Sequence, residues 1–180
     1  MNKILLSSGV AIWLLAGSAQ AIEGGFEAGK NYTTINVGMG TTTPGLSLSG
    51  NWMRSDHDGS LSGVGVGYNF QVGSVFLSPG VKAMYISPED SKDGYAVALG
   101  ASAQMPLANM LGVYGEYYYA PDALSSRIDN YQEASAGLSF TPISMVNLRV
   151  GYRYLALDGK DGRKDNLLAD GPYIGGSLRF

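Results

Sequence analysis

The feature that most constrains this chain is an alternation of apolar residues with small or polar ones. In "VGVGYNFQV", residues 64–72, apolar and aromatic side chains share one face, and Gly65, Gly67, Asn69 and Gln71 share the other. The stretch "YAVALGASAQM", residues 95–105, repeats the pattern. Because successive side chains of a strand point to opposite faces, the alternation predicts strands with one apolar face and one face of small or polar residues.

Similar segments follow one another along the chain, and each is about the 9 to 11 residues that a tilted strand needs to cross a bilayer. Short connections around Gly73, Ala108 and Pro142 alternate with longer, charged ones. This asymmetry predicts an all-β fold, an antiparallel up-and-down transmembrane β-barrel of the outer membrane with its short turns toward the periplasm. The segments are residues 33–40, 46–53, 64–72, 75–86, 95–105, 111–119, 133–141, 147–157 and 172–180.

The parity of the strand count requires one further strand. If the last segment ends at the periplasmic rim, the segment at Thr33 starts at the outer rim, so a periplasmic N-terminus needs a strand before it. We expect a weaker strand within "IEGGFEAGK", residues 22–30, which gives ten strands. Eight strands, with the N-terminal segment outside the wall or folded into it, is the alternative, since bacterial single-chain barrels have even strand numbers.

Residues 1–21, "MNKILLSSGVAIWLLAGSAQA", have the plan of a cleaved secretory signal peptide. They combine Lys3, an apolar run and the ending Ala19-Gln20-Ala21. The run is shorter than the roughly 20 residues of a spanning helix, although a retained anchor helix is the alternative. Residues 22–180 are then predicted to form a single barrel domain.

The composition excludes several classes of protein. The chain has no cysteine, which rules out disulfides, thiolate metal sites and lipoprotein attachment. The net charge of −3 becomes −4 once the +1 of Lys3 is removed, so no basic surface for nucleic acid is expected. The mean hydropathy of +0.01 rules out a bundle of membrane helices.

Four charged residues share the inward parity of glycines and serines: Lys82, Glu116, Arg149 and Arg153. Buried charges need partners, so Glu116 is expected to pair with Arg149 or Arg153. A barrel of this size encloses little more than its own side chains, which favours a lumen plugged by ion pairs and a structural or interaction role. The alternative is a narrow channel for small solutes or ions, in which Lys82 and the arginines would favour anions.

Six tyrosines have outward parity near the strand ends that meet the long connections. A tyrosine there can bury its ring in lipid while its hydroxyl reaches water, which predicts an aromatic girdle. A carbohydrate-binding platform is the alternative. These residues are Tyr85, Tyr95, Tyr117, Tyr119, Tyr152 and Tyr154.

Catalytic and metal signals are weak. His57, the only histidine, lies between Asp56 and Asp58, but no activated nucleophile accompanies it, so we expect a solvated turn rather than a rim enzyme acting on lipid or peptide. Asp158, Asp161 and Asp165 lack the spacing of a calcium loop. We therefore predict no enzymatic activity, no metal and no cofactor.

Several longer stretches resemble the YfaZ family of Gram-negative outer-membrane proteins. They are "NWMRSDHDGS", "SKDGYAVALG", "GEYYYAPDALSS", "IDNYQEASAG", "GYRY" and "GKDGRKDNLLADG". The resemblance covers nearly all of the mature chain and implies a barrel in the cell outer membrane. It implies no substrate and no catalytic residues.

The ending "GPYIGGSLRF" looks like the C-terminal signal that the barrel-assembly machinery recognises in its clients. The residues that carry this resemblance are Tyr173, Gly175, Leu178 and Phe180. The expected partners are therefore the assembly machinery and periplasmic chaperones during biogenesis, and outer-membrane lipid and lipopolysaccharide afterwards. No nucleic-acid partner is expected.

Overall fold

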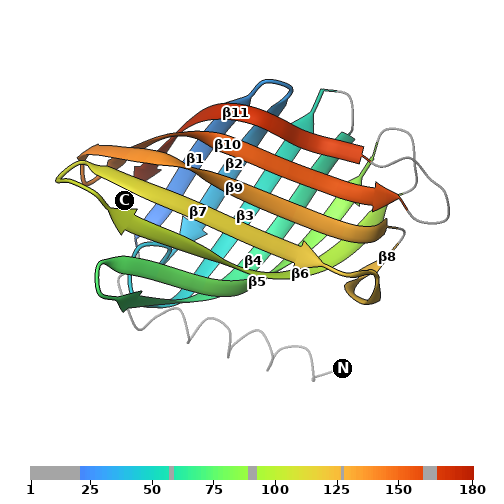
Figure 1. Ribbon diagram of the computed structural model, residues 1–180, viewed down its shortest axis with the longest axis horizontal. Helices are drawn as coiled ribbons and strands as arrows, with labels where there is room; N and C mark the ends of the chain where they lie inside the picture. Colours follow the sequence, from blue (N-terminus) through green and yellow to red (C-terminus); the bar gives the residue numbers. More distant parts are fainter. Residues whose placement is uncertain (1–20, 57–58, 89–92, 127, 160–165) are drawn as a thin grey trace, which may run out of the picture.

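Antiparallel strands close into a barrel in the computed structural model, which describes residues 21–56, 59–88, 93–126, 128–159 and 166–180 (Figure 1). Ten long strands form the wall, and consecutive long strands are hydrogen-bonded neighbours. The wall strands are β1 (Ile22–Gly29), β2 (Tyr32–Met39), β3 (Gly45–Ser55), β4 (Gly59–Val72), β5 (Val75–Ser87), β6 (Gly94–Pro106), β7 (Leu111–Ala120), β9 (Ile128–Ile143), β10 (Val146–Gly159) and β11 (Asn166–Arg179). The predicted up-and-down barrel of ten strands is confirmed, and the eight-strand alternative is wrong.

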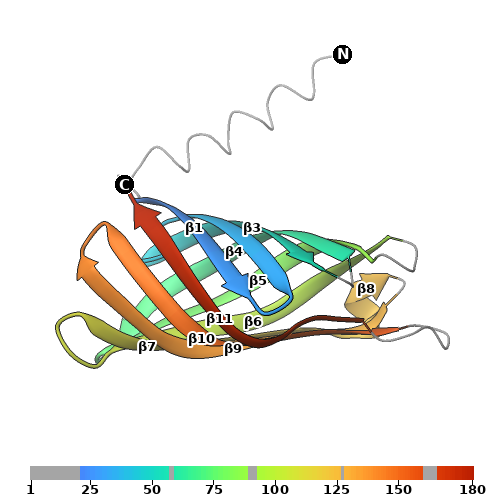
Figure 2. The same ribbon diagram turned by 90° about the horizontal axis from the view of Figure 1, so that it is seen from above.

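The first and last strands close the barrel. β1 pairs with β11, with Gly24 opposite Leu178 and Gly29 opposite Tyr173. Beyond this ladder, Phe180 N donates to Ile22 O at 2.9 Å and Ile22 N donates to Phe180 O at 3.1 Å. The weak strand that parity required therefore exists, and Figure 2 shows β1 and β11 side by side at the end that carries the C-terminus.

Strand lengths differ from the sequence-based expectation. β4, β10 and β11 have 14 residues and β9 has 16, more than the predicted 9 to 11. The extra residues come from stretches interpreted as loops, because hairpin hydrogen bonds continue past the height that lipid requires. The stretch at residues 120–132 also contains a 3-10 turn (Asp122–Leu124) and the two-residue β8 (Ser125–Ser126), which pairs with β6.

The barrel has two unlike ends. The connections at residues 40–44, 73–74, 107–110 and 144–145 gather at one end, which we call the short-turn end. The opposite end, the long-loop end, carries the three longest connections, which follow β5, β7 and β10, and two shorter ones at residues 30–31 and 56–58. Among the residues that the structure describes, no helix is long and apolar enough to cross a membrane.

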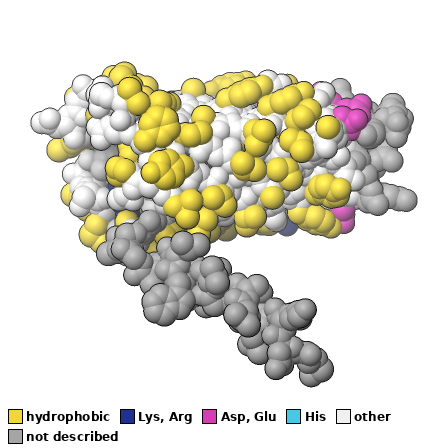
Figure 3. All heavy atoms as spheres, turned by 90° about the horizontal axis from the view of Figure 1, so that it is seen from below, with side chains coloured by type: hydrophobic (Ala, Val, Ile, Leu, Met, Phe, Trp, Pro, Cys, Tyr) yellow, Lys and Arg dark blue, Asp and Glu magenta, His cyan; other side chains and the backbone are white. Residues whose placement is uncertain are grey.

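The outer surface of the barrel is apolar, as the alternation predicts. Outward residues such as Val64, Leu99, Val150 and Ile174 are exposed. Figure 3 shows hydrophobic side chains spread over the flank of the barrel, with acidic side chains at one end. The six tyrosines predicted to face outward are all exposed: Tyr85, Tyr95, Tyr117, Tyr119, Tyr152 and Tyr154.

Candidate functional site

The lumen is filled by apolar side chains toward the long-loop end. Their strands place them on the inward face, and the largest of them are at most 1% exposed. They come from every wall strand except β1 and β2, so they converge on the lumen from most of its circumference. We call this cluster the outer plug; it consists of Met53, Leu61, Met84, Ile86, Ala96, Ala98, Ala120, Ile128, Tyr131, Leu155, Leu157 and Leu168.

A network of five charged side chains, which we call the ion-pair belt, lies next to the outer plug on its short-turn side. Arg153 Nη1 is 2.8 Å from Glu27 Oε2, and Arg153 Nη2 is 3.2 Å from Glu116 Oε1. Lys82 Nζ is 3.6 Å from Glu116 Oε2 and 2.9 Å from Glu133 Oε2. The belt therefore links β1, β5, β7, β9 and β10 across the lumen.

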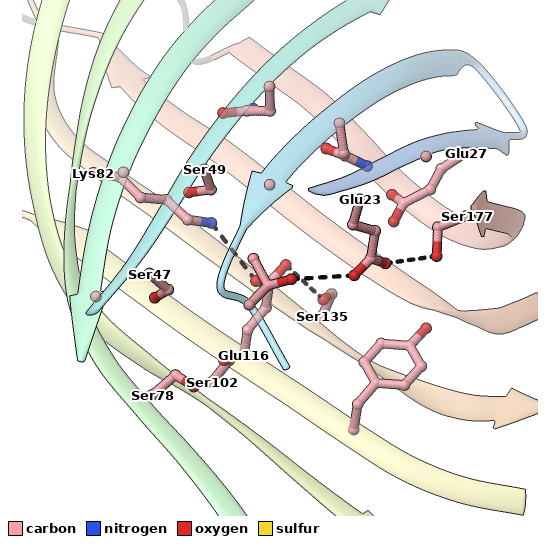
Figure 4. Close-up of a pocket in the computed structure, with 18 of the residues that line it drawn as sticks. Glu23, Glu27, Ser47, Ser49, Ser78, Lys82, Ser102, Glu116, Ser135 and Ser177 are labelled. Atoms are coloured by element: carbon pink, nitrogen blue, oxygen red, sulfur yellow. Dashed lines mark hydrogen bonds and ion pairs between the residues drawn. The ribbon is translucent and has the colours of Figure 1, made fainter. Parts of the chain in front are cut away.

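Hydroxyl groups and aromatic rings support the belt. Ser135 Oγ donates to Glu116 at 3.0 Å, and Tyr131 OH donates to Glu133 at 2.9 Å. Lys82 Nζ lies 3.9 Å from the centroid of the Tyr118 ring. Figure 4 shows Lys82 and Ser135 converging on Glu116 from different strands. These contacts compensate the cost of taking the charges out of bulk water.

A polar cavity of about 210 Å³, which we call the chamber, lies on the short-turn side of the ion-pair belt. It extends toward the short-turn end, where Thr41 of the β2–β3 turn lines it and donates to Glu23 Oε2 at 3.1 Å. Asn69 holds the same turn against the inner wall through bonds to the carbonyls of Gly40 and Thr43. The other polar residues that line the chamber include Asn36, Asn51, Gln104 and Arg149. Figure 4 shows further lining residues, Ser47, Ser49, Ser78, Ser102 and Ser177.

The structure brings together three of the four predicted lumen charges. Lys82, Glu116 and Arg153 belong to the belt, and Glu116 pairs with Arg153 rather than with Arg149. Arg149 lies apart: its Nε donates to Asn147 Oδ1 at 3.0 Å, and its guanidinium is 5.1 Å from the centroid of the Tyr114 ring.

Sequence reasoning missed Glu27 and Glu133. Glu27 lies in the weakest strand, where no inward face was assigned. Glu133 was taken only as the first residue of a predicted segment, although its parity with Ser135 and Gly137 places it inward. Parity would also have assigned the residues of the outer plug to the inward face, but not their gathering at one end of the lumen, where they add an apolar layer to the expected ion pairs.

The residues of the C-terminal motif divide between the two faces of β11. Leu178 and Phe180 are exposed on the outer face, whereas Tyr173 is buried inside. Gly175 faces inward, where a Cβ would lie 2.8 Å from Glu27 Cγ. The part of this motif in assembly stays a prediction.

Several predicted features lie outside the described residues: the signal peptide up to residue 20, His57, and Asp161 and Asp165 of the charged loop. Within the described ranges, no group of histidine, aspartate and glutamate side chains is arranged to hold a metal ion. The prediction that the protein is not an enzyme stays a prediction.

A sequence model of the family described as "YfaZ precursor" matches residues 1–180. The chain belongs to the YfaZ family. The outer membrane protein YfaZ of Escherichia coli strain K12 is 46% identical over 180 residues, which is 100% of both chains. This YfaZ-family barrel is therefore a protein of the cell outer membrane, and by the general asymmetry of such barrels its short-turn end faces the periplasm.

Solved structures show the same kind of fold. The KdgM porin in complex with disordered oligogalacturonate is 13% identical, with a TM-score of 0.50, and the match covers 89% of this chain and 99% of that one. The outer membrane channel DcaP of Acinetobacter baumannii is 17% identical with a TM-score of 0.47, and the match covers 86% of this chain and 54% of that one. The likeness to the KdgM porin extends to the barrel architecture of this YfaZ-family protein and no further.

Proposed function

We propose that this YfaZ-family barrel is a closed outer-membrane protein with a structural or binding role, and not an open diffusion pore. The observation that carries the proposal is the outer plug. Its side chains are apolar and nearly inaccessible to water, so an ion that entered there would lose its hydration shell without gaining a partner. The belt below adds a second layer of side chains across the lumen.

A gated channel is the second candidate. The observation in its favour is the chamber, which leaves the short-turn half of the lumen hollow as far as the belt residues Lys82 and Glu116. In that case the outer plug would have to rearrange before solutes could pass. The two candidates differ in what the resting protein conducts.

Single-channel recording in planar bilayers tests the proposal. The mature chain, refolded in detergent and shown to be heat-modifiable, should insert without giving stable conductance steps. A porin reconstituted in parallel is the control for insertion. Regular steps from the unmodified protein would contradict the closed barrel and favour the channel.

A further inference from the structure

Arg149 is the one cation lining the chamber that has no carboxylate oxygen within 4.0 Å in the described part of the chain, although Glu23, Glu27 and Glu116 attract it over longer distances. Lys82 and Arg153 are each ion-paired to two glutamates, and Arg179, at the same end of the lumen, is paired with Glu23 at 3.4 Å. Arg149 makes one hydrogen bond, through Nε to Asn147, and uses a ring face of Tyr114. A guanidinium carries five N–H donors, so the two terminal nitrogens of Arg149 are left to whatever occupies the chamber.

The wall across the chamber carries polar groups that form no hydrogen bonds within the described residues. Hydroxyl and amide side chains there both donate and accept, which suits hydroxyl groups of a ligand. Arg153 also lines the chamber. Its side chain is only 7% exposed, and its Nε has no hydrogen-bond partner. The uncommitted residues of the wall are Asn36, Ser49, Asn51, Ser78, Ser102 and Gln104.

Glycines keep the chamber open. A Cβ at Gly65 would lie 2.5 Å from Ser49 Oγ, and one at Gly67 would lie 2.9 Å from Ser47 Oγ. The cavity of about 210 Å³ is smaller than the roughly 300 to 1,000 Å³ of drug-sized sites. The space fits a solute of monosaccharide size or smaller.

We propose that the chamber binds a small organic anion that carries hydroxyl groups. Arg149 holds the anionic group through its terminal nitrogens, in the planar geometry that a carboxylate accepts from a guanidinium. The serines and amides of the opposite wall bind the hydroxyls. The ligand enters from the periplasm, and only this direction of access rests on the proposed closed barrel.

Isothermal titration calorimetry of the refolded barrel with D-gluconate tests the proposal. Gluconate should bind saturably, while neutral D-glucose and sulfate should each bind about tenfold more weakly, because one lacks the charge and the other the hydroxyls. Arg149→Gln should weaken gluconate binding by about tenfold. Arg54→Gln, a change at an exposed arginine on the outer face of β3, should leave binding unchanged.

Ser49→Val is a second, independent test in case Arg149→Gln does not fold. It keeps Arg149 and fills part of the chamber. It should also weaken gluconate binding.

The proposal is overturned if the unmodified barrel shows no saturable heat at millimolar gluconate, or if gluconate binds Arg149→Gln and Ser49→Val as it binds the original. Sulfate binding as tight as gluconate would overturn the assigned ligand class. A barrel that binds nothing yet stays closed in bilayers refutes this inference alone, whereas one that binds gluconate and conducts refutes only the closed barrel.

Discussion

Single glycines decide how tyrosines fit inside the barrel. Tyr114 lies against the wall with its hydroxyl beside Gly137 and Gly151, and there it meets the hydroxyl of Tyr173. A Cβ at Gly151 would lie 2.5 Å from Tyr114 Oη and 2.6 Å from the carbonyl oxygen of Ala136. The inward glycines therefore leave the space that the tyrosine rings fill, and these rings stabilise the cations of the lumen.

Gly151→Ala should destabilise the barrel by about 1 to 3 kcal/mol, because the added methyl overpacks Tyr114 and the neighbouring backbone. Urea unfolding in lipid vesicles, followed by the fluorescence of Trp52, measures the change; Trp52 is the only tryptophan beyond the predicted signal peptide. Gly24→Ala is the matched control, since a Cβ there meets nothing within 4 Å. Equal stability of the two variants would contradict the packing argument.

At the scale of an element, β10 passes through all three zones of the lumen. Its inward residues run from Arg149 in the chamber, through Arg153 in the belt, to Leu155 and Leu157 in the outer plug. Two arginines four residues apart on one strand thus have different surroundings. Arg153 is neutralised by Glu27 and Glu116, whereas Arg149 has no carboxylate oxygen within 4.0 Å among the described residues.

Arg153→Met should lower the free energy of unfolding by about 3 kcal/mol or more, because Glu27 is left buried without its partner. Arg149→Met should lower it by only about 1 kcal/mol, because Arg149 has no carboxylate oxygen within 4.0 Å and only its longer-range attraction to Glu23 and Glu116 is lost. Adding Glu27→Gln to Arg153→Met should restore part of the loss. The same unfolding assay gives all three values, and an equal loss for both arginine variants would refute the distinction.

The closing strand β1 shows how an element of weak local pattern is held. Its inward glutamates reach across the seam, Glu27 to Arg153 of β10 and Glu23 to Arg179 of β11. Ser177 of β11 also donates to Glu23 at 2.6 Å. β1 therefore depends on lumen contacts as well as on its backbone ladder.

For the whole molecule, the two ends of the lumen have opposite chemistry. The long-loop half is apolar and packed, and the short-turn half is polar and hollow. A soluble protein would place its apolar core at the centre. A barrel in lipid has an apolar exterior, so its lumen can hold either apolar or polar side chains. The lumen is therefore packed toward the long-loop end and hollow toward the short-turn end.

Removing the outer plug should convert the barrel into a channel. The triple variant Ile86→Ser, Leu155→Ser and Leu157→Ser removes apolar bulk from two sides of the lumen and lets water enter. Planar bilayers should then show conductance steps that the original protein lacks. The same three positions changed to methionine conserve volume and should stay closed; silence of the serine variant would mean that the belt also closes the lumen.

Much of the fold and part of the site could be predicted from the sequence. The alternation identified strands such as residues 64–72 and assigned their faces, and strand parity required β1. Parity also directed Lys82, Glu116, Arg149 and Arg153 inward. It could not say which of them meet, because partners such as Arg153 and Glu116 lie 37 residues apart and contact only through the register of the strands between them.

The sequence by itself determined that this chain forms a barrel with an apolar exterior. Side chains of a strand alternate between its two faces, so the residues that face lipid can be identified from the alternation of apolar residues. Only the tertiary structure decided the height of each inward side chain, because tilt and register accumulate from strand to strand around the wall. Those heights gather the apolar residues into the outer plug, place Glu27 and Glu133 in the belt and leave Arg149 free to face the chamber.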